Sequence, residues 1–412
     1  MKQQGGHAGV TRRRVRSLIG ACGVVGALTT SVIVAPPGLA VMNRAADAPI
    51  VGAADVHGTT TEGVGTASSL GVPGAYRNAP RRGLRGGAAF EARQAGAVSA
   101  AASAPAEGSF VSYNHRIFRI VGGAPLYVSS WTPFGGTKPV RAITESQYLA
   151  TSQYPRDGTF VRAMPGASFF RFVAGAPIYV STWTAFGGRQ TATDIDANDI
   201  ARAGGVFPWD GVWNMTLDWD GSDGGPAVFV KGGQTGRVYK MVGGAPVYVR
   251  SWTPYGGRKS TVTIDQNAID RAGGTNSYRF VRKHPLDGWL IRARQSGRTF
   301  VVAGGASIYV SNTNLITGVT PSPMDQVLIE RTDNTAPWDN LLFRPVNHTY
   351  VKAIQNGAVY QVTWGVPHHV LHWSDVGGVQ PNTAIDKTAI DNAGKTGVWA
   401  HLLAVGSDVP SS

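Results

Sequence analysis

Residues 118–131 read Phe-Arg-Ile-Val-Gly-Gly-Ala-Pro-Leu-Tyr-Val-Ser-Ser-Trp, and Phe-Gly-Gly follows at 134–136. Close copies of this stretch stand at 170–188 and 239–257, and looser copies stand at 300–313 and 360–378. Successive copies lie 52, 69, 61 and 60 residues apart, as measured between the aligned glycines Gly123, Gly175, Gly244, Gly305 and Gly365. Self-similarity at this period indicates an array of one supersecondary unit.

A unit of this size cannot bury its apolar face alone, so neighbouring units must pack against one another. The sequence therefore predicts one mainly β domain over residues 106–407, made of five repeats of about 60 residues. Such an array is more typical of a binding surface that is displayed several times than of a single catalytic pocket.

Each copy predicts short strands followed by a short helix. Asp-Gly between apolar runs, as at 157–158, marks a turn before a first strand. A second strand is expected over 117–121, and Gly-Gly-Ala-Pro forms a tight connection to a third strand over 126–131. Bulky residues alternate onto both faces of this third strand, so we expect both faces to be covered.

The helix follows the third strand. In the third copy an apolar face at helical spacing is formed by Ile264, Ala268, Ile269 and Ala272. Asp265 is expected to cap this helix at its N-terminus and Gly273 at its C-terminus. Asp196 and Asp386 stand at the equivalent positions of two other copies.

The two ends of the array suggest how it closes. An apolar strand is expected to lead into later units, over 212–217, 278–281 and 341–343, but none precedes the first unit. The chain ends with a similar stretch, 397–405, and no unit follows it. If Val398–Leu403 pairs as a strand near Phe110, the array closes and two exposed edges disappear. The favoured architecture is a propeller-like closed array, and the alternative is an open row of small β-rich modules.

The first 40 residues are predicted to be a signal peptide. Four arginines at 12–16 form a basic region, residues 17–35 are mostly small and apolar, and Gly38-Leu39-Ala40 offers a cleavage site. An uncleaved membrane anchor is the alternative. Cys22 is the only cysteine and lies inside this segment, so the secreted domain would rely on its apolar core and not on disulfides.

Residues 41–105 are rich in Ala, Gly, Ser and Arg without periodicity, which predicts a disordered linker. The net charge of +13 is concentrated before residue 106, because residues 106–412 contain 27 basic and 21 acidic side chains. That modest excess argues against nucleic acid as a partner. Membrane contact is expected only through the N-terminal segment, if it is retained.

The repeated stretch Tyr/Phe-Arg-x-Val-Gly-Gly-Ala-Pro-x-Tyr-Val-Ser-Ser-Trp resembles repeats of secreted or cell-wall-associated proteins of actinobacteria. The resemblance covers residues 108–405, with the first three copies matching well and the last two loosely. It implies an extracellular or cell-wall location and a repeat architecture. It carries no defined activity.

Aromatic residues at equivalent positions are the candidate ligand-binding residues. Trp131, Trp183, Trp252 and Trp373 stand at equivalent positions at the end of the third strand, and Tyr127, Tyr179, Tyr248 and Tyr309 also occupy equivalent positions. These rings could stack on sugars, but the favoured interpretation is that they fill the interfaces between units. The aromatic residues of the Gly-Gly loops, Phe134, Phe186 and Tyr255, are the better candidates for an exposed contact.

No cofactor, metal site or catalytic constellation is predicted. The stretch 218–225 resembles a calcium loop but has Asp223 where the EF-hand pattern needs Gly. His368 and His372, on one face of a strand, would lie roughly 13 Å apart and could not share an ion.

The leading hypothesis is therefore a secreted, non-catalytic module that binds cell-wall or other glycans. An extracellular protein-interaction or adhesion scaffold is the second hypothesis, and a hydrolase with a central site is the third.

Overall fold

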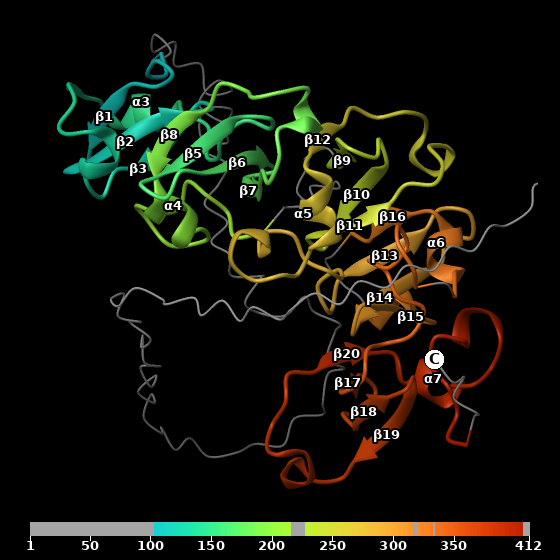
Figure 1. Cartoon of the computed structure of the whole chain (residues 1–412). Helices are drawn as coiled ribbons and strands as arrows, with labels where there is room; N and C mark the ends of the chain where they lie inside the picture. Colours follow the sequence, from blue (N-terminus) through green and yellow to red (C-terminus); the bar gives the residue numbers. More distant parts are fainter. Residues whose placement is uncertain (1–102, 216–226, 316–319, 333, 407–412) are drawn as a thin grey trace, which may run out of the picture. The chain divides into compact units, whose positions relative to one another are not determined.

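The computed structural model describes residues 103–215, 227–315, 320–332 and 334–406. All of them belong to one of the two units into which the chain divides, Val64–Ser412. The described part is mainly β, with five four-stranded sheets that follow one another along the chain (Figure 1). Each sheet is built from one contiguous stretch, so each is one repeat of the predicted array. The predicted signal peptide, most of the linker and the stretch 218–225 lie outside the described residues.

The strands of the first three repeats are β1 (Phe110–Tyr113), β2 (Arg116–Val121), β3 (Ala124–Tyr127) and β4 (Val140–Ala142); β5 (Phe160–Met164), β6 (Ser168–Val173), β7 (Ala176–Tyr179) and β8 (Thr193–Asp196); β9 (Phe229–Gly232), β10 (Val238–Val242), β11 (Ala245–Tyr248) and β12 (Val262–Ile264). Those of the last two are β13 (Leu290–Ala293), β14 (Thr299–Ala303), β15 (Ala306–Val310) and β16 (Ser322–Met324); β17 (Thr349–Ala353), β18 (Val359–Thr363), β19 (Val366–Val370) and β20 (Thr383–Ile385).

Every sheet has the same topology. Three consecutive strands form an antiparallel meander, and the fourth pairs parallel to the first, so the order in the first sheet is β3-β2-β1-β4. The predicted second strands are confirmed to within a residue at either end. The Gly-Gly connection also behaves as predicted, because Gly122 and Gly123 both take positive φ between β2 and β3. The third strand ends earlier than expected, at Tyr127, but its residues are buried or half-buried as predicted.

Short helices complete each repeat. Each repeat has a 3-10 turn after its third strand: η1 (Thr132–Phe134), η2 (Thr184–Phe186), η3 (Thr253–Tyr255), η5 (Thr313–Leu315) and η6 (Trp373–Val376). The α-helices follow the fourth strands and are α3 (Glu145–Leu149), α4 (Ala197–Ala201), α5 (Gln266–Asp270), α6 (Gln326–Glu330) and α7 (Lys387–Asp391). Two further 3-10 turns are η4 (Asn276–Tyr278) and η7 (Gly397–Trp399).

The helix caps are largely as predicted. Asp265 accepts a hydrogen bond from the backbone N–H of Asn267, and Asp196 and Asp386 act alike at α4 and α7. The predicted start of the apolar helix face is wrong, because Ile264 is the last residue of β12 and not part of α5. The short fourth strand, which the sequence did not suggest, therefore takes the residues just before the cap.

The apolar segments after the helices are not strands, contrary to the prediction. In 212–215, 278–281 and 341–343 the backbone forms turns or one isolated bridge. Their backbone N–H groups instead bond to the hairpin glycines of the same repeat. Trp213 donates to the Gly175 carbonyl at 2.8 Å, and Arg282 donates to that of Gly244 at 2.9 Å. These post-helix segments, 202–215, 271–286, 331–348 and 392–406, thus fold back over the Gly-Gly hairpins.

Each repeat packs against the next through the same pair of elements. The helix and post-helix segment of one repeat cover the third strand of the preceding repeat, as in the contact of α7 with β15. The 3-10 turn of the preceding repeat contacts the fourth strand of the next, as in the contact of η1 with β8. Buried side chains of neighbouring sheets share clusters, so the core passes from repeat to repeat.

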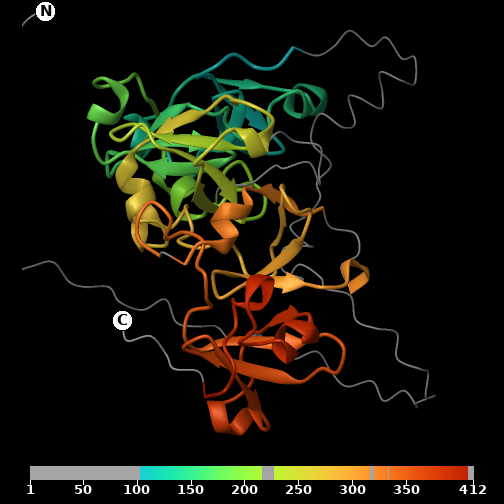
Figure 2. The same cartoon turned by 90° about the vertical axis from the view of Figure 1, so that its right-hand side faces the viewer.

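The predicted closure through the last strand is wrong. Residues 397–399 form a 3-10 turn, and Leu403 donates to the carbonyl of Gly365 in its own repeat. Trp399 contacts Tyr309 of the fourth repeat at 5.0 Å. The first sheet is complete with β1–β4, and the described residues form neither a closed barrel nor a propeller. In Figure 2 the terminal segment, in red, belongs to the fifth repeat.

Among the described residues, no helix combines the length and the apolar character that crossing a membrane requires.

Candidate functional site

The predicted aromatic residues gather in one cluster per repeat, which we call the turn cluster. In the first repeat the rings of Trp131 and Phe134 lie 5.3 Å and 5.2 Å from that of Phe110, at the start of β1. The second repeat places Trp183 and Phe186 around Phe160 in the same way. The third repeat repeats the arrangement with Trp252 and Tyr255 around Phe229, and Trp373 contacts Tyr350 in the fifth. Local sequence thus brings each Trp to its loop aromatic residue.

A cation from the second strand supports the turn cluster in the first two repeats. The guanidinium of Arg119 lies 5.1 Å from the Phe110 ring centre and 5.6 Å from that of Phe134. Its Nη1 donates to the backbone carbonyl of Asp194 in the next repeat at 2.6 Å. Arg171 repeats both contacts in the second repeat. Burial lowers the pKa of Arg119, against the opposing effect of Asp194, which marks this cation as part of the packing between repeats.

The turn clusters differ in how much of them a ligand could touch. Trp131, Phe134, Trp183, Phe186, Trp252 and Trp373 are all half-buried. Tyr255 has only 5% of its surface exposed, and burial raises the pKa of its hydroxyl to about 12. The expected contrast between exposed loop rings and core tryptophans is therefore absent, and Tyr255 is a packing residue. The tryptophans and the loop aromatic residues both pack within their own repeat and beside its junction with the next repeat.

A second aromatic set lies at the junctions, where the equivalent third-strand tyrosines meet partner rings that were not identified from the sequence. The third-strand tyrosine of one repeat meets an aromatic ring of the next post-helix segment at nearly right angles. The ring pairs are Tyr127–Trp209 at 4.8 Å, Tyr179–Tyr278 at 5.3 Å, Tyr248–Trp338 at 4.7 Å and Tyr309–Trp399 at 5.0 Å. We call these the junction pairs. The repeated stretch does not reveal these pairs, because the partner rings lie far from the tyrosines in sequence and outside that stretch.

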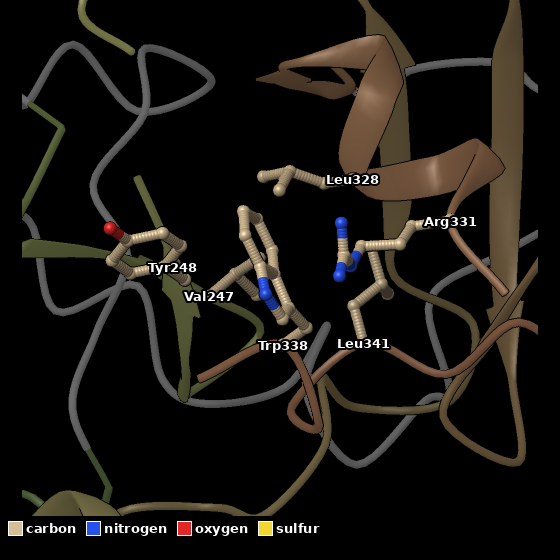
Figure 3. Close-up of a pocket in the computed structure, with 6 residues that line it drawn as sticks. All are labelled: Val247, Tyr248, Leu328, Arg331, Trp338 and Leu341. Atoms are coloured by element: carbon tan, nitrogen blue, oxygen red, sulfur yellow. The ribbon is translucent and has the colours of Figure 1, made fainter. Parts of the chain in front are cut away.

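An arginine covers the outer ring at three of the four junction pairs. The guanidinium groups of Arg202, Arg271 and Arg331 lie 5.0, 5.3 and 4.2 Å from the rings of Trp209, Tyr278 and Trp338. Figure 3 shows the third of these, with Trp338 between Tyr248 and Arg331. Each arginine directly follows its helix. The helix therefore positions the guanidinium group, and the post-helix segment positions the ring on which it stacks.

The junction between the second and third repeats opens to solvent. A hollow of about 850 Å³ is lined by Tyr179 of β7 and by the stretch Arg271–Tyr278, with Lys283 at its side. It therefore combines two aromatic rings, two cations and the polar backbone of a glycine-rich turn. Asn276 holds a positive φ of 54° within this turn, where an asparagine is tolerated. The lining offers stacking faces and hydrogen-bond donors to one ligand.

The next junction is closed. The equivalent residues Val247, Tyr248, Leu328, Arg331, Trp338 and Leu341 enclose only about 10 Å³ (Figure 3). That space suffices for no more than one water molecule. The tyrosine, the arginine and the post-helix ring are therefore packed tightly at the junction of the third and fourth repeats. At the junction of the second and third repeats they line an open hollow.

No metal centre is assembled by the described residues, since their His, Cys, Asp and Glu side chains form no group of three or more that could hold an ion. His368 and His369 lie exposed on β19. Comparison with family models, curated proteins and solved structures found no match to this chain.

Proposed function

We propose that this protein is a secreted, non-catalytic binding module of the bacterial surface that recognises cell-wall or other glycans. The hollow between the second and third repeats is the observation that carries the proposal. The hollow is shallow and open, and it offers the combination of aromatic faces and polar donors that a carbohydrate needs. The basic N-terminal segment and the resemblance to actinobacterial cell-wall repeats support an extracellular location.

The charge of the hollow favours an acidic glycan. Arg271 is exposed and stacks its guanidinium on Tyr278, and Lys283 forms an ion pair with Asp339. An arginine in this position can still present N–H groups to a carboxylate or phosphate. The turn clusters, including Trp131, Trp183, Trp252 and Trp373, would then position the repeats and contribute little to binding.

The proposal is tested by binding of the full chain to an array of neutral and acidic oligosaccharides. We expect Arg271→Ala to weaken binding to the strongest acidic oligosaccharide about tenfold or more, because a hydrogen bond to a charged group contributes roughly 1.5–3 kcal/mol. The melting temperature should hardly change, because the side chain is exposed.

Arg258→Ala is the matched control, since Arg258 is an exposed arginine of the same repeat that does not line the hollow. Equal losses in the two variants would indicate general charge attraction and would contradict a site in the hollow. Absence of binding to every oligosaccharide would contradict the glycan proposal itself.

A further inference from the structure

The third strand of each of the first four repeats has its outer edge covered by the next repeat. The clearest link joins a serine just after the strand to the aspartate that caps the next helix. The backbone N–H groups of Ser129, Ser181 and Ser311 donate to Oδ2 of Asp196, Asp265 and Asp386 at 2.9, 2.7 and 2.8 Å. Each serine hydroxyl donates to the same oxygen. At the third junction the aspartate, Asp325, lies 3.7 Å from the guanidinium of Arg250.

The link at the fourth junction explains the state of the Asp386 carboxylate. Burial alone would raise the pKa of Asp386, but hydrogen bonds led by that of Ser311 outweigh it and hold the pKa below its ordinary value. The outer edge of β15 is therefore a receptor for an ionised carboxylate. At the first junction the backbone N–H of Tyr127 donates to a second acid, Asp199, at 3.2 Å.

The fifth repeat has the same edge, and no repeat among the described residues covers it. By alignment on the hairpin, His369 and Leu371 take the places of Tyr127 and Ser129, and β19 pairs with β18 in the same register as β3 with β2. The N–H groups of His369 and Leu371 therefore point away from β18. Within the described part of the chain no acceptor meets them.

The side chains along this edge differ from those at the covered edges. His368 replaces the buried Leu126, and Leu371 exposes 72% of its surface. Trp364 exposes 58% and stands where the first repeat has Gly122, whose surroundings are filled by the chain entering the next repeat. An aromatic ring, an aliphatic side chain and two imidazoles are thus exposed along β19 and its hairpin, a segment that we call the terminal edge.

The chemistry of the terminal edge distinguishes its possible occupants. Pro367 lacks an N–H at the outward position, so a further strand cannot extend the sheet there. Strand pairing between two copies of the chain is therefore disfavoured. A carboxylate fits the outward N–H of Leu371 as one fits the N–H groups of Ser129, Ser181 and Ser311. The imidazoles of His368 and His369 are further donors along this edge.

We propose that the terminal edge binds a partner protein through an aspartate or glutamate that caps a short helix of that partner. Trp364 and Leu371 supply the apolar contact, as the junction pairs do inside the array. The partner thus occupies the place of a sixth repeat. This inference concerns a different surface from the hollow and does not depend on the glycan proposal.

The probe is a fluorescent peptide with the sequence of residues 262–283, which carries the docking helix of the third repeat and its cap Asp265. Its binding to the full chain is followed by fluorescence anisotropy. We expect saturable binding that falls at least tenfold when the peptide carries Asp265→Ala. It should fall similarly when the chain carries Leu371→Glu, which places a negative charge beside the receptor N–H groups.

Val206→Glu is the matched control, because Val206 is equally apolar and exposed but lies in the second repeat. Trp364→Gly restores the residue found at this hairpin position in other repeats and should weaken binding without harming the fold. Absence of binding by the unmodified peptide would overturn the proposal. Sedimentation showing a dimer that Leu371→Glu dissociates would also overturn it, in favour of a second copy as the occupant.

Discussion

Asp199 shows how a single residue can depart from an otherwise regular pattern. It stands in α4 where α5 and α7 have Ala268 and Ala389, and only 2% of its surface is exposed. Burial, with a further contribution from Asp196, raises the pKa of Asp199 well above its ordinary value. Within the described residues its Oδ2 has no hydrogen-bond partner. The first junction therefore contains an acid that is favoured in its protonated form.

This arrangement predicts a pH dependence of stability. A carboxyl group whose pKa is raised by folding stabilises the native state fully below its unfolded pKa, and this contribution is lost as the pH rises toward the folded value. We expect Asp199→Asn, which stays neutral, to raise the melting temperature at pH 8 by a few degrees and to change it little at pH 4. Calorimetry at both pH values measures this, and an equal effect at both would contradict it.

Sequence reasoning worked well for residues whose role is local. The helix caps Asp196, Asp265 and Asp386 were identified because a cap acts on its own first turn. Their second role, accepting bonds from a serine 67 to 84 residues away, left no local signal. The partner rings of the junction tyrosines were missed for the same reason.

At the scale of the element, the cap and the link between repeats can be separated. Asp265 caps α5 and also holds Ser181, whereas Thr144 caps only its own helix, α3, in a capping box. Loss of a cap alone costs about 0.5–2 kcal/mol. We expect Thr144→Ala to fall in that range and Asp265→Ala to exceed it, since the second also leaves buried donors unpaired.

Chemical denaturation measures the free energy of unfolding of both variants. Together with Ser181→Ala and the double variant Ser181→Ala/Asp265→Ala, Asp265→Ala completes a double-mutant cycle. A coupling energy of about 0.5–3 kcal/mol between residues 181 and 265 is expected for neighbours in one hydrogen-bond network. Additive effects would show that the two residues act independently.

The fourth strands show what the sequence could not reveal about elements. They are short, such as Val262–Ile264, and a three-residue segment gives no measurable periodicity. Each pairs with a first strand about thirty residues earlier, as Val262 does with Val230. The isoleucines at these positions were correctly identified as apolar and were assigned to the wrong element.

For the whole molecule, the repeat number and the mainly β class followed from the spacing of the Gly-Gly hairpins. The manner of connection did not follow. In the last apolar stretch, 397–405, only His401 and Leu402 are buried, Val405 exposes 79% of its surface, and the backbone is irregular. An apolar pattern predicts that a stretch is covered but does not tell which element covers it. The inferred closure onto the first sheet was therefore wrong.

Because each repeat contacts only its neighbours, truncation at one end of the array should destabilise only the nearby repeats. Removing residues 397–412 deletes Trp399 and His401, which pack on the fourth repeat; burial lowers the pKa of that histidine to about 4. We expect faster amide hydrogen exchange in the fourth and fifth repeats and unchanged exchange in the first two. Loss of protection throughout would indicate that all repeats unfold together.

The direction of the serine–aspartate links bears on how the chain is made. Each repeat leaves its third-strand edge open until the helix of the following repeat has emerged from the ribosome, because the covering element always comes later in sequence. During synthesis a nascent chain therefore carries one uncovered third-strand edge at a time. In β3, β7 and β11 a proline at the outward position lacks the N–H that another strand would need, so it disfavours pairing with a wrong strand before the next repeat has folded. Vectorial synthesis and the polarity of the array thus act together against misassembly.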